Sequence, residues 1–193
     1  MASVVEICNS ALNQLGASTI LSLTENSKNG RLCNSRYETV KDSVLRAHPW
    51  NSAIKRQALA ADTATPAWGF TKQYTLPSDC LRVLTIQNYE SNYKLEGRKI
   101  LTNDDNVKLI YVARITDPNE MDVLLRETIS AALASDLAYA ITANATLQQR
   151  MADKYQDKLS EARHADASEG YNTDPTLGET DNILSEDFIN SRL

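Results

Sequence analysis

The chain has 193 residues, a formal net charge of −5 and a pI near 5.1. This length is enough for one domain with a sizeable core. The acidic balance argues against an ordinary DNA- or RNA-binding protein, which needs a basic face to neutralise phosphates. No segment approaches the roughly 18 apolar residues of a membrane span, and the first residues show no basic stretch before an apolar run. We therefore expect a soluble protein, made inside the cell, that has no contact with a membrane.

Three cysteines occur in the chain, at positions 8, 33 and 80, and they form no CxxC pair. An odd number excludes a complete disulfide framework, and the spacing disfavours a metal knuckle. We expect reduced, buried thiols. The two histidines have no partner at the spacing of a metal site or a catalytic triad, so no metal, cofactor or catalytic residue is predicted.

The first predicted helix covers residues 4–15. Ser3 and Glu6 fit a capping box, in which each side chain accepts a hydrogen bond from the backbone of the other. Apolar residues then recur at helical spacing, and Gly16 stands where a left-handed residue commonly ends a helix.

Three more helices follow from similar patterns. One is predicted over residues 28–47, because a His-Pro pair comes directly after it and the residue before a proline is pushed out of the helical region. A third is predicted to start where Asp117 caps Pro118 at the first helical position. Asn144 is predicted to cap a fourth helix, which Gly170 ends.

The middle third of the chain has a different pattern. Short runs rich in Tyr, Val, Ile and Thr alternate with turn residues, which is typical of strands, at residues 70–76, 81–87, 93–96, 99–102 and 107–112. Gly97 and Arg98 fit a tight hairpin between two of these runs. Residues 51–59 fit either a short helix or a strand, and we favour a strand.

The last segment, residues 171–193, has no sustained periodicity. Five acidic residues against one arginine give it a net charge of −4. One interpretation is a disordered, solvated terminus. The other is a docking arm, because a purely solvating segment does not need the large apolar side chains of Ile183, Leu184, Phe188 and Ile189.

Together these patterns predict an α+β fold. Residues 1–49 and 116–170 are expected to form an antiparallel four-helix bundle from an N-terminal and a C-terminal helix pair. Residues 50–115 are expected to form a small antiparallel β insert between helices two and three. Residues 171–193 are expected to be an extended acidic C-terminal tail.

Several motifs occur in a fixed order over about residues 4–165. They are Ile7-Cys8-Asn9-Ser10-Ala11-Leu12, Val44-Leu45-Arg46-Ala47-His48-Pro49-Trp50-Asn51, Leu76-Pro77-Ser78-Asp79-Cys80-Leu81-Arg82-Val83, Tyr111-Val112-Ala113-Arg114 and the helix at 131–137. This succession resembles the tail tubular protein A family, the tail adaptors of podoviruses. The chain departs from the family pattern at Ser52, where we expect a phenylalanine.

The resemblance implies a structural head-to-tail connector of the virion, assembled in the host cytoplasm. It implies a ring of about twelve copies, whose lateral contacts close by rotation. The ring would bind the portal protein and the tail nozzle protein, tail tubular protein B. It would also extend the channel through which viral DNA passes without sequence-specific binding. No enzymatic activity is expected.

Trp68, Arg56 and Arg82 are the interface candidates outside the C-terminal segment. Tryptophan is enriched at binding hot spots, and the loop around Trp68 allows either an exposed contact or a core position. The two arginines can pair with acids of a neighbouring subunit, or they can be ordinary solvated side chains. Trp50, beside a helix end, is predicted to lie in the core.

Two other functions are weighed against the adaptor. A virion hydrolase that cuts cell-wall glycans needs two carboxylates about 5 to 9 Å apart. The sequence indicates no such pair of carboxylates, and it contains no GxSxG, HExxH, P-loop or GxGxxG motif. A head-completion connector of another phage type would share the helical bundle, but residues 76–83 favour the short-tailed adaptor.

Overall fold

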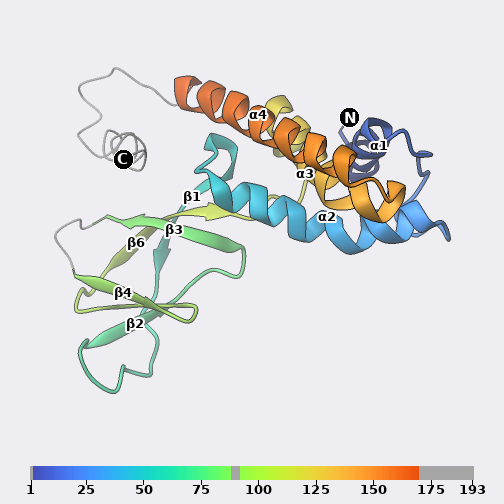
Figure 1. The fold of residues 1–193 in the computed structure, drawn as a ribbon. Helices are drawn as coiled ribbons and strands as arrows, with labels where there is room; N and C mark the ends of the chain where they lie inside the picture. The colour runs from blue at the N-terminus through green and yellow to red at the C-terminus, as the bar shows by residue number, and fades with distance from the viewer. Residues whose placement is uncertain (1, 88–91, 170–193) are drawn as a thin grey trace.

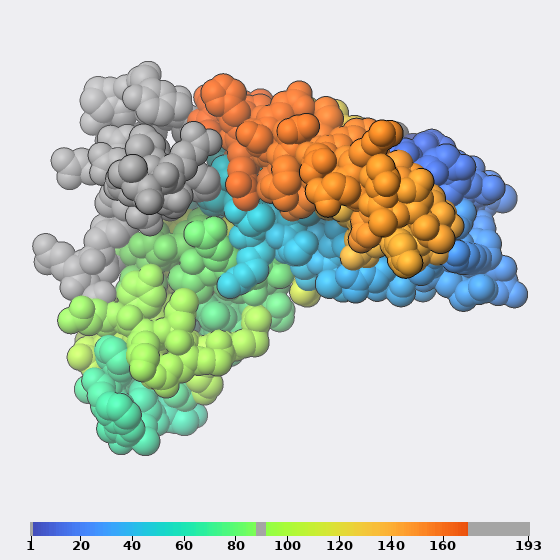
Figure 2. All heavy atoms as spheres, in the orientation of Figure 1, coloured from blue at the N-terminus to red at the C-terminus, as the bar shows by residue number. Residues whose placement is uncertain are grey.

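The computed structural model describes residues 2–87 and 92–169 (Figure 1). Helices α1 (Val4–Gln14), α2 (Lys28–Ala47), α3 (Val123–Thr142) and α4 (Ala145–Glu169) pack together. The strands lie between α2 and α3 in the chain and form a second body that projects from one end of the helices (Figure 2). None of the helices in the described ranges is long and apolar enough to cross a membrane.

Side-chain caps fix the start of two helices as the sequence predicted. Ser3 Oγ accepts from the Glu6 amide at 3.1 Å, and Glu6 Oε2 accepts from the Ser3 amide at 2.8 Å. This reciprocal pair is the predicted capping box, and Gly16 follows α1 in the left-handed region with φ +66°. Asn144 Oδ1 accepts from the Leu147 amide at 3.0 Å at the start of α4. Gly170 lies outside the described residues.

The predicted start of the third helix is wrong. Asp117 caps only a 3-10 turn, η2 (Pro118–Glu120), and the chain is extended again at Met121. The α-helix begins at Val123, where Asp122 Oδ2 accepts from the Leu124 amide at 2.7 Å. Two acidic caps therefore stand five residues apart, and the sequence alone did not show which of them opens the long helix.

Helix α3 is the centre of the helical layer. Its residues 128–134 are all buried, so its middle is covered on every side, and α1, α2 and α4 each pack against it. A helix that is apolar all round belongs inside a protein rather than at its surface. Small residues let the neighbours approach from different directions, and the buried positions include Ser130, Ala131, Ala132, Ala134 and Ala138.

The described residues contain six strands, which form two antiparallel three-stranded sheets. The first has the order β1-β6-β3, from β1 (Ile54–Leu59), β6 (Val107–Ala113) and β3 (Cys80–Ile86). The second has the order β2-β5-β4, from β2 (Lys72–Thr75), β5 (Lys99–Thr102) and β4 (Tyr93–Glu96). Gly97 has φ +60° in the predicted hairpin between β4 and β5. The ambiguous residues 51–59 are a 3-10 turn, η1 (Asn51–Ala53), followed by strand β1.

Two hydrophobic cores result. One lies between the helices and also contains Trp50 and Val112, so Trp50 is a core residue as predicted. The other lies between the two sheets and consists of Tyr74, Cys80, Ile86, Ile100, Val107, Leu109, Tyr111 and Ala113. The three cysteines are free and buried, as predicted.

The predicted fold class is therefore wrong. The strands are not a small insert, because they make two sheets with a core of their own. The helices are not an antiparallel four-helix bundle, because three of them surround α3 instead of forming a square of alternating neighbours. The buried alanines of α3 make more than one of its faces a packing surface.

The central place of α3 predicts a large effect of shortening one of its side chains. Leu133 is fully buried, so we expect Leu133→Ala to lower the free energy of unfolding by about 2 to 5 kcal/mol. The matched control is Leu21→Ala, since Leu21 is 94% exposed and such a surface change stays within about 0.5 kcal/mol. Urea unfolding followed by circular dichroism measures both. Equal effects of the two substitutions would contradict the central role of α3.

Candidate interaction surfaces

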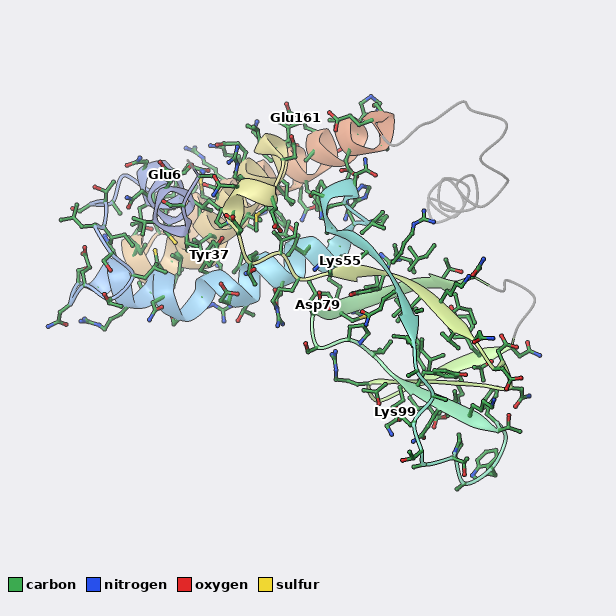
Figure 3. All side chains as sticks on the ribbon, turned by 180° about the vertical axis from the view of Figure 1, so that it is seen from behind. Glu6, Tyr37, Lys55, Asp79, Lys99 and Glu161 are labelled. Carbon is green, nitrogen blue, oxygen red and sulfur yellow. The ribbon has the colours of Figure 1, made fainter. Side chains whose placement is uncertain are left out.

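A polar cluster lies where the first sheet meets the connection from β2 to β3. Lys55 Nζ lies 3.0 Å from Asp79 Oδ2, and the Tyr111 hydroxyl donates to Asp79 Oδ1 at 3.2 Å. Figure 3 shows Lys55 and Asp79 facing each other across neighbouring segments. The Asp79 carbonyl also accepts from the Arg114 amide at 2.7 Å. We call Lys55, Asp79 and Tyr111 the junction cluster.

Burial and charge act together on the junction cluster. Partial burial acts to raise the pKa of Asp79, but the Lys55 ammonium and the Tyr111 hydroxyl outweigh it and leave the pKa below its ordinary value. Burial and the neighbouring Asp79 charge raise the pKa of Tyr111 to about 12. Asp79 is therefore a charged, paired carboxylate at neutral pH, and Tyr111 is a neutral donor.

Ion pairs and hydrogen bonds also join the sheets to the helices. Arg114 binds Asp42 of α2 through Nε and Nη2, the shorter contact being 2.6 Å. At the other end of the junction, His48 Nε2 lies 3.0 Å from Asp166 Oδ2 of α4. The Asn51 amide donates to Asp166 Oδ1 at 3.0 Å. Both α2 and α4 therefore hold the root of the sheet body.

A broad, open depression borders the junction cluster. Its lining consists of Ile54, Lys55, Arg56, Gln57, Pro77, Ser78, Asp79 and Tyr111. Asp79 is the single carboxylate in this lining, and it is already paired with Lys55. Acid and base chemistry on a glycan needs two carboxylates. Within residues 2–87 and 92–169, no three His, Cys, Asp or Glu side chains gather as metal ligands.

Trp68 belongs to the loop between β1 and β2. This loop lies at the end of the sheet body farthest from the helices (Figure 1). Its side chain is 85% exposed. The base of the loop is held, because Asp62 accepts from Thr75 Oγ1 and pairs with Lys99 Nζ, both at 3.0 Å. The Asp62 amide also donates to the Gln73 carbonyl at 2.9 Å. A loop that is held at its base thus presents one large aromatic side chain to solvent.

Arg56 and Arg82 lie on the two outer strands of the first sheet, on either side of β6. Arg56 is opposite Ile110 and Arg82 is opposite Val112, so both arginines share the face of β6 that carries these two residues. Both side chains are exposed. The other candidates, Ile183, Leu184, Phe188 and Ile189, lie outside the described residues.

Sequence reasoning missed the junction cluster, an exposed leucine in the loop between α1 and α2, and an exposed tyrosine of α3. Lys55 and Tyr111 gave no signal, because their meeting with Asp79 depends on strand pairings between residues far apart in the chain. The missed exposed side chains are Leu21 and Tyr139, which is 57% exposed.

A scan against protein-family models and a search of curated proteins both find no match to this chain.

The lowered pKa of Asp79 predicts a specific pH dependence of stability. The unfolded chain binds a proton at this carboxyl more readily than the folded chain does. The stabilisation is therefore complete above about pH 4 and is lost as the pH falls through the lower folded value. We expect Asp79→Asn to reduce stability at pH 7 and to flatten the loss of stability below about pH 4. Urea unfolding at a series of pH values measures this.

The control for this experiment is Asp153→Asn, an equal charge change at an exposed residue of α4. With this substitution, the loss of stability at low pH should be the same as in the unmodified chain. If Asp79→Asn leaves the loss of stability at low pH unchanged, this result contradicts the role given to the Lys55 and Tyr111 contacts.

Proposed function

We propose that the chain is a structural tail adaptor of a short-tailed phage. Copies of it form a ring of about twelve subunits that joins the portal to the tail nozzle and continues the DNA channel. It acts in the virion tail after assembly in the host cytoplasm and has no catalytic role. The ordered succession of motifs over about residues 4–165 is the sequence basis of this proposal.

The structural observation that carries the proposal is the exposed Trp68 on a body that projects from the helices. A subunit that joins two partners needs two separate surfaces, and the chain offers the sheet body and the helices (Figure 2). An exposed tryptophan at the far end of the sheet body, on a loop held by Asp62, is the kind of side chain that dominates binding energy at interfaces. We assign this end to the nozzle and the helices to the portal.

The open depression beside the junction cluster is the second support. An enzyme of this size needs an enclosed cleft with converging polar groups, whereas this depression is open and contains one paired carboxylate. The overall charge of −5 also suits a DNA channel. An acidic lumen does not hold a passing polyanion, and a basic lumen would bind it in a salt-dependent way.

Light scattering after size exclusion tests the proposal directly. The purified chain is measured alone and then mixed with its cognate portal ring. We expect the mixture to elute at a mass that corresponds to a ring of adaptors on the portal. Separate elution of the two proteins at low and at high salt would contradict the adaptor function.

Substitution of Trp68 separates the two proposed surfaces. We expect Trp68→Ala to weaken nozzle binding about 30-fold, the effect of losing about 2 kcal/mol at a hot spot. Portal binding should stay as it is in the unmodified chain. The matched control is Tyr139→Ala, because it removes an exposed aromatic side chain from α3 and should leave nozzle binding intact. Biosensor titration with each partner ring gives both affinities, and unchanged nozzle binding by Trp68→Ala would rule out this surface.

A further inference from the structure

One face of the sheet β1-β6-β3 is only half covered by the helices. Val112 of β6 is fully buried in the helical core, and Leu81 and Leu84 of β3 pack against that core. Farther along the same face, Lys108 is exposed and Ile110 is half-buried. We call this uncovered part the outer face, and its members are Arg56, Ala58, Arg82, Thr85, Lys108 and Ile110.

The members of the outer face share one side of the sheet by register. Arg56 is opposite Ile110 and Ala58 is opposite Lys108, while Thr85 of β3 is opposite Ile110 from the other side. Alternate residues of a strand point to the same side. The outer face is therefore a continuous surface across all three strands, with Ile110 near its middle.

The outer face is basic. Arg56, Arg82 and Lys108 are exposed, and none of the six residues that make up this face is acidic. Within residues 2–87 and 92–169, neither Arg82 nor Lys108 forms an ion pair. The wider sequence has the same bias, because residues 50–115 contain nine basic and six acidic residues in a chain of negative net charge.

The C-terminal segment has the complementary chemistry. Residues 171–193 contain a single arginine and five acids, Asp174, Glu179, Asp181, Glu186 and Asp187. Between and beside the acids stand Ile183, Leu184, Phe188 and Ile189. A surface of three cations around a half-buried isoleucine fits a segment in which acids and large apolar side chains alternate.

The chain leaves α4 beside this sheet. Asp166, three residues before the end of α4, accepts from the Asn51 amide at the root of β1. Asn51 and Arg56 are five residues apart, which is at most about 17 Å at 3.3 Å per residue. The C-terminal end of α4 lies on the side of the helices where β1 begins (Figure 1). The 24 residues after Glu169 can extend by up to about 3.3 Å each, so they reach the outer face of their own chain easily.

We propose that residues 171–193 bind the outer face of the first sheet of the same chain. Their acids pair with Arg56, Arg82 and Lys108, and their apolar side chains cover Ile110. Direct tethering gives the segment an effective concentration in the millimolar range, so individually weak contacts suffice. A partner of this face must first displace the segment. The inference depends on charge and distance and not on the proposed adaptor function.

Paramagnetic broadening in the full-length chain tests this proposal. A nitroxide is attached at Ser191→Cys, and because Cys8, Cys33 and Cys80 are buried, the added thiol is the one that reacts. We expect loss of the backbone amide signals of β1 and β6 around the outer face, and recovery when the nitroxide is reduced. Signals of α1, at the opposite end of the helices, should persist. Persistence of all β1 and β6 signals would overturn the proposal.

Two comparisons make the test specific. The signals should return in the variant Arg82→Glu/Lys108→Glu and stay lost in the control Lys94→Glu, which changes an exposed lysine of β4 in the other sheet. They should also return at about 1 M salt, where the Debye length is about 3 Å. Broadening that survives the double charge reversal would overturn the assignment to this face. Broadening seen only when spin-labelled and isotope-labelled chains are mixed would overturn binding within one chain.

Discussion

The whole structure depends on strand β6, because this strand belongs to both hydrophobic cores. Its alternation puts Val112 among the helices and Tyr111 between the two sheets. Pairing of β1 and β3 with its two edges brings the beginning of the sheet body next to its end. The two helix pairs, which are separated by the strands in the chain, are therefore held together at one place. Loss of this pairing would disconnect both cores, so the two bodies are expected to unfold as one unit.

Local signals in the sequence were sufficient for most of the elements but not for the start of α3 or for the assembly of the elements. The capping box at Ser3, the cap at Asn144 and the hairpin at Gly97 each depend on a few neighbouring residues, and each is found where it was expected. The architecture depends on contacts that those patterns do not encode. An alanine on a helix is equally suited to a solvent face and to close packing, so the pattern of α3 did not reveal that residues 128–134 are buried on all sides.

The same reasoning applies to the candidate surfaces. The composition of the loop explains the exposure of Trp68 only in part. The position of the loop also depends on its base, where Asp62 contacts Thr75 and Lys99. The junction cluster could not be predicted from the sequence, because Lys55, Asp79 and Tyr111 come from three segments that only the register of the sheet aligns. Arg56 and Arg82 were named as isolated cations, and it is the bulged pairing of β3 with β6 that puts them on one face.

Charge placement connects the two proposals without making either depend on the other. For the proposed adaptor, a basic sheet face is a liability before assembly, because such a face binds nucleic acid without specificity. An acidic segment tethered beside that face would neutralise it in the free chain at little cost, because the contact is weak and local. A partner surface that offers stronger pairing to Arg82 and Lys108 would release the segment. Its apolar side chains would then become available for a second contact, so that binding at one surface would enable binding at another.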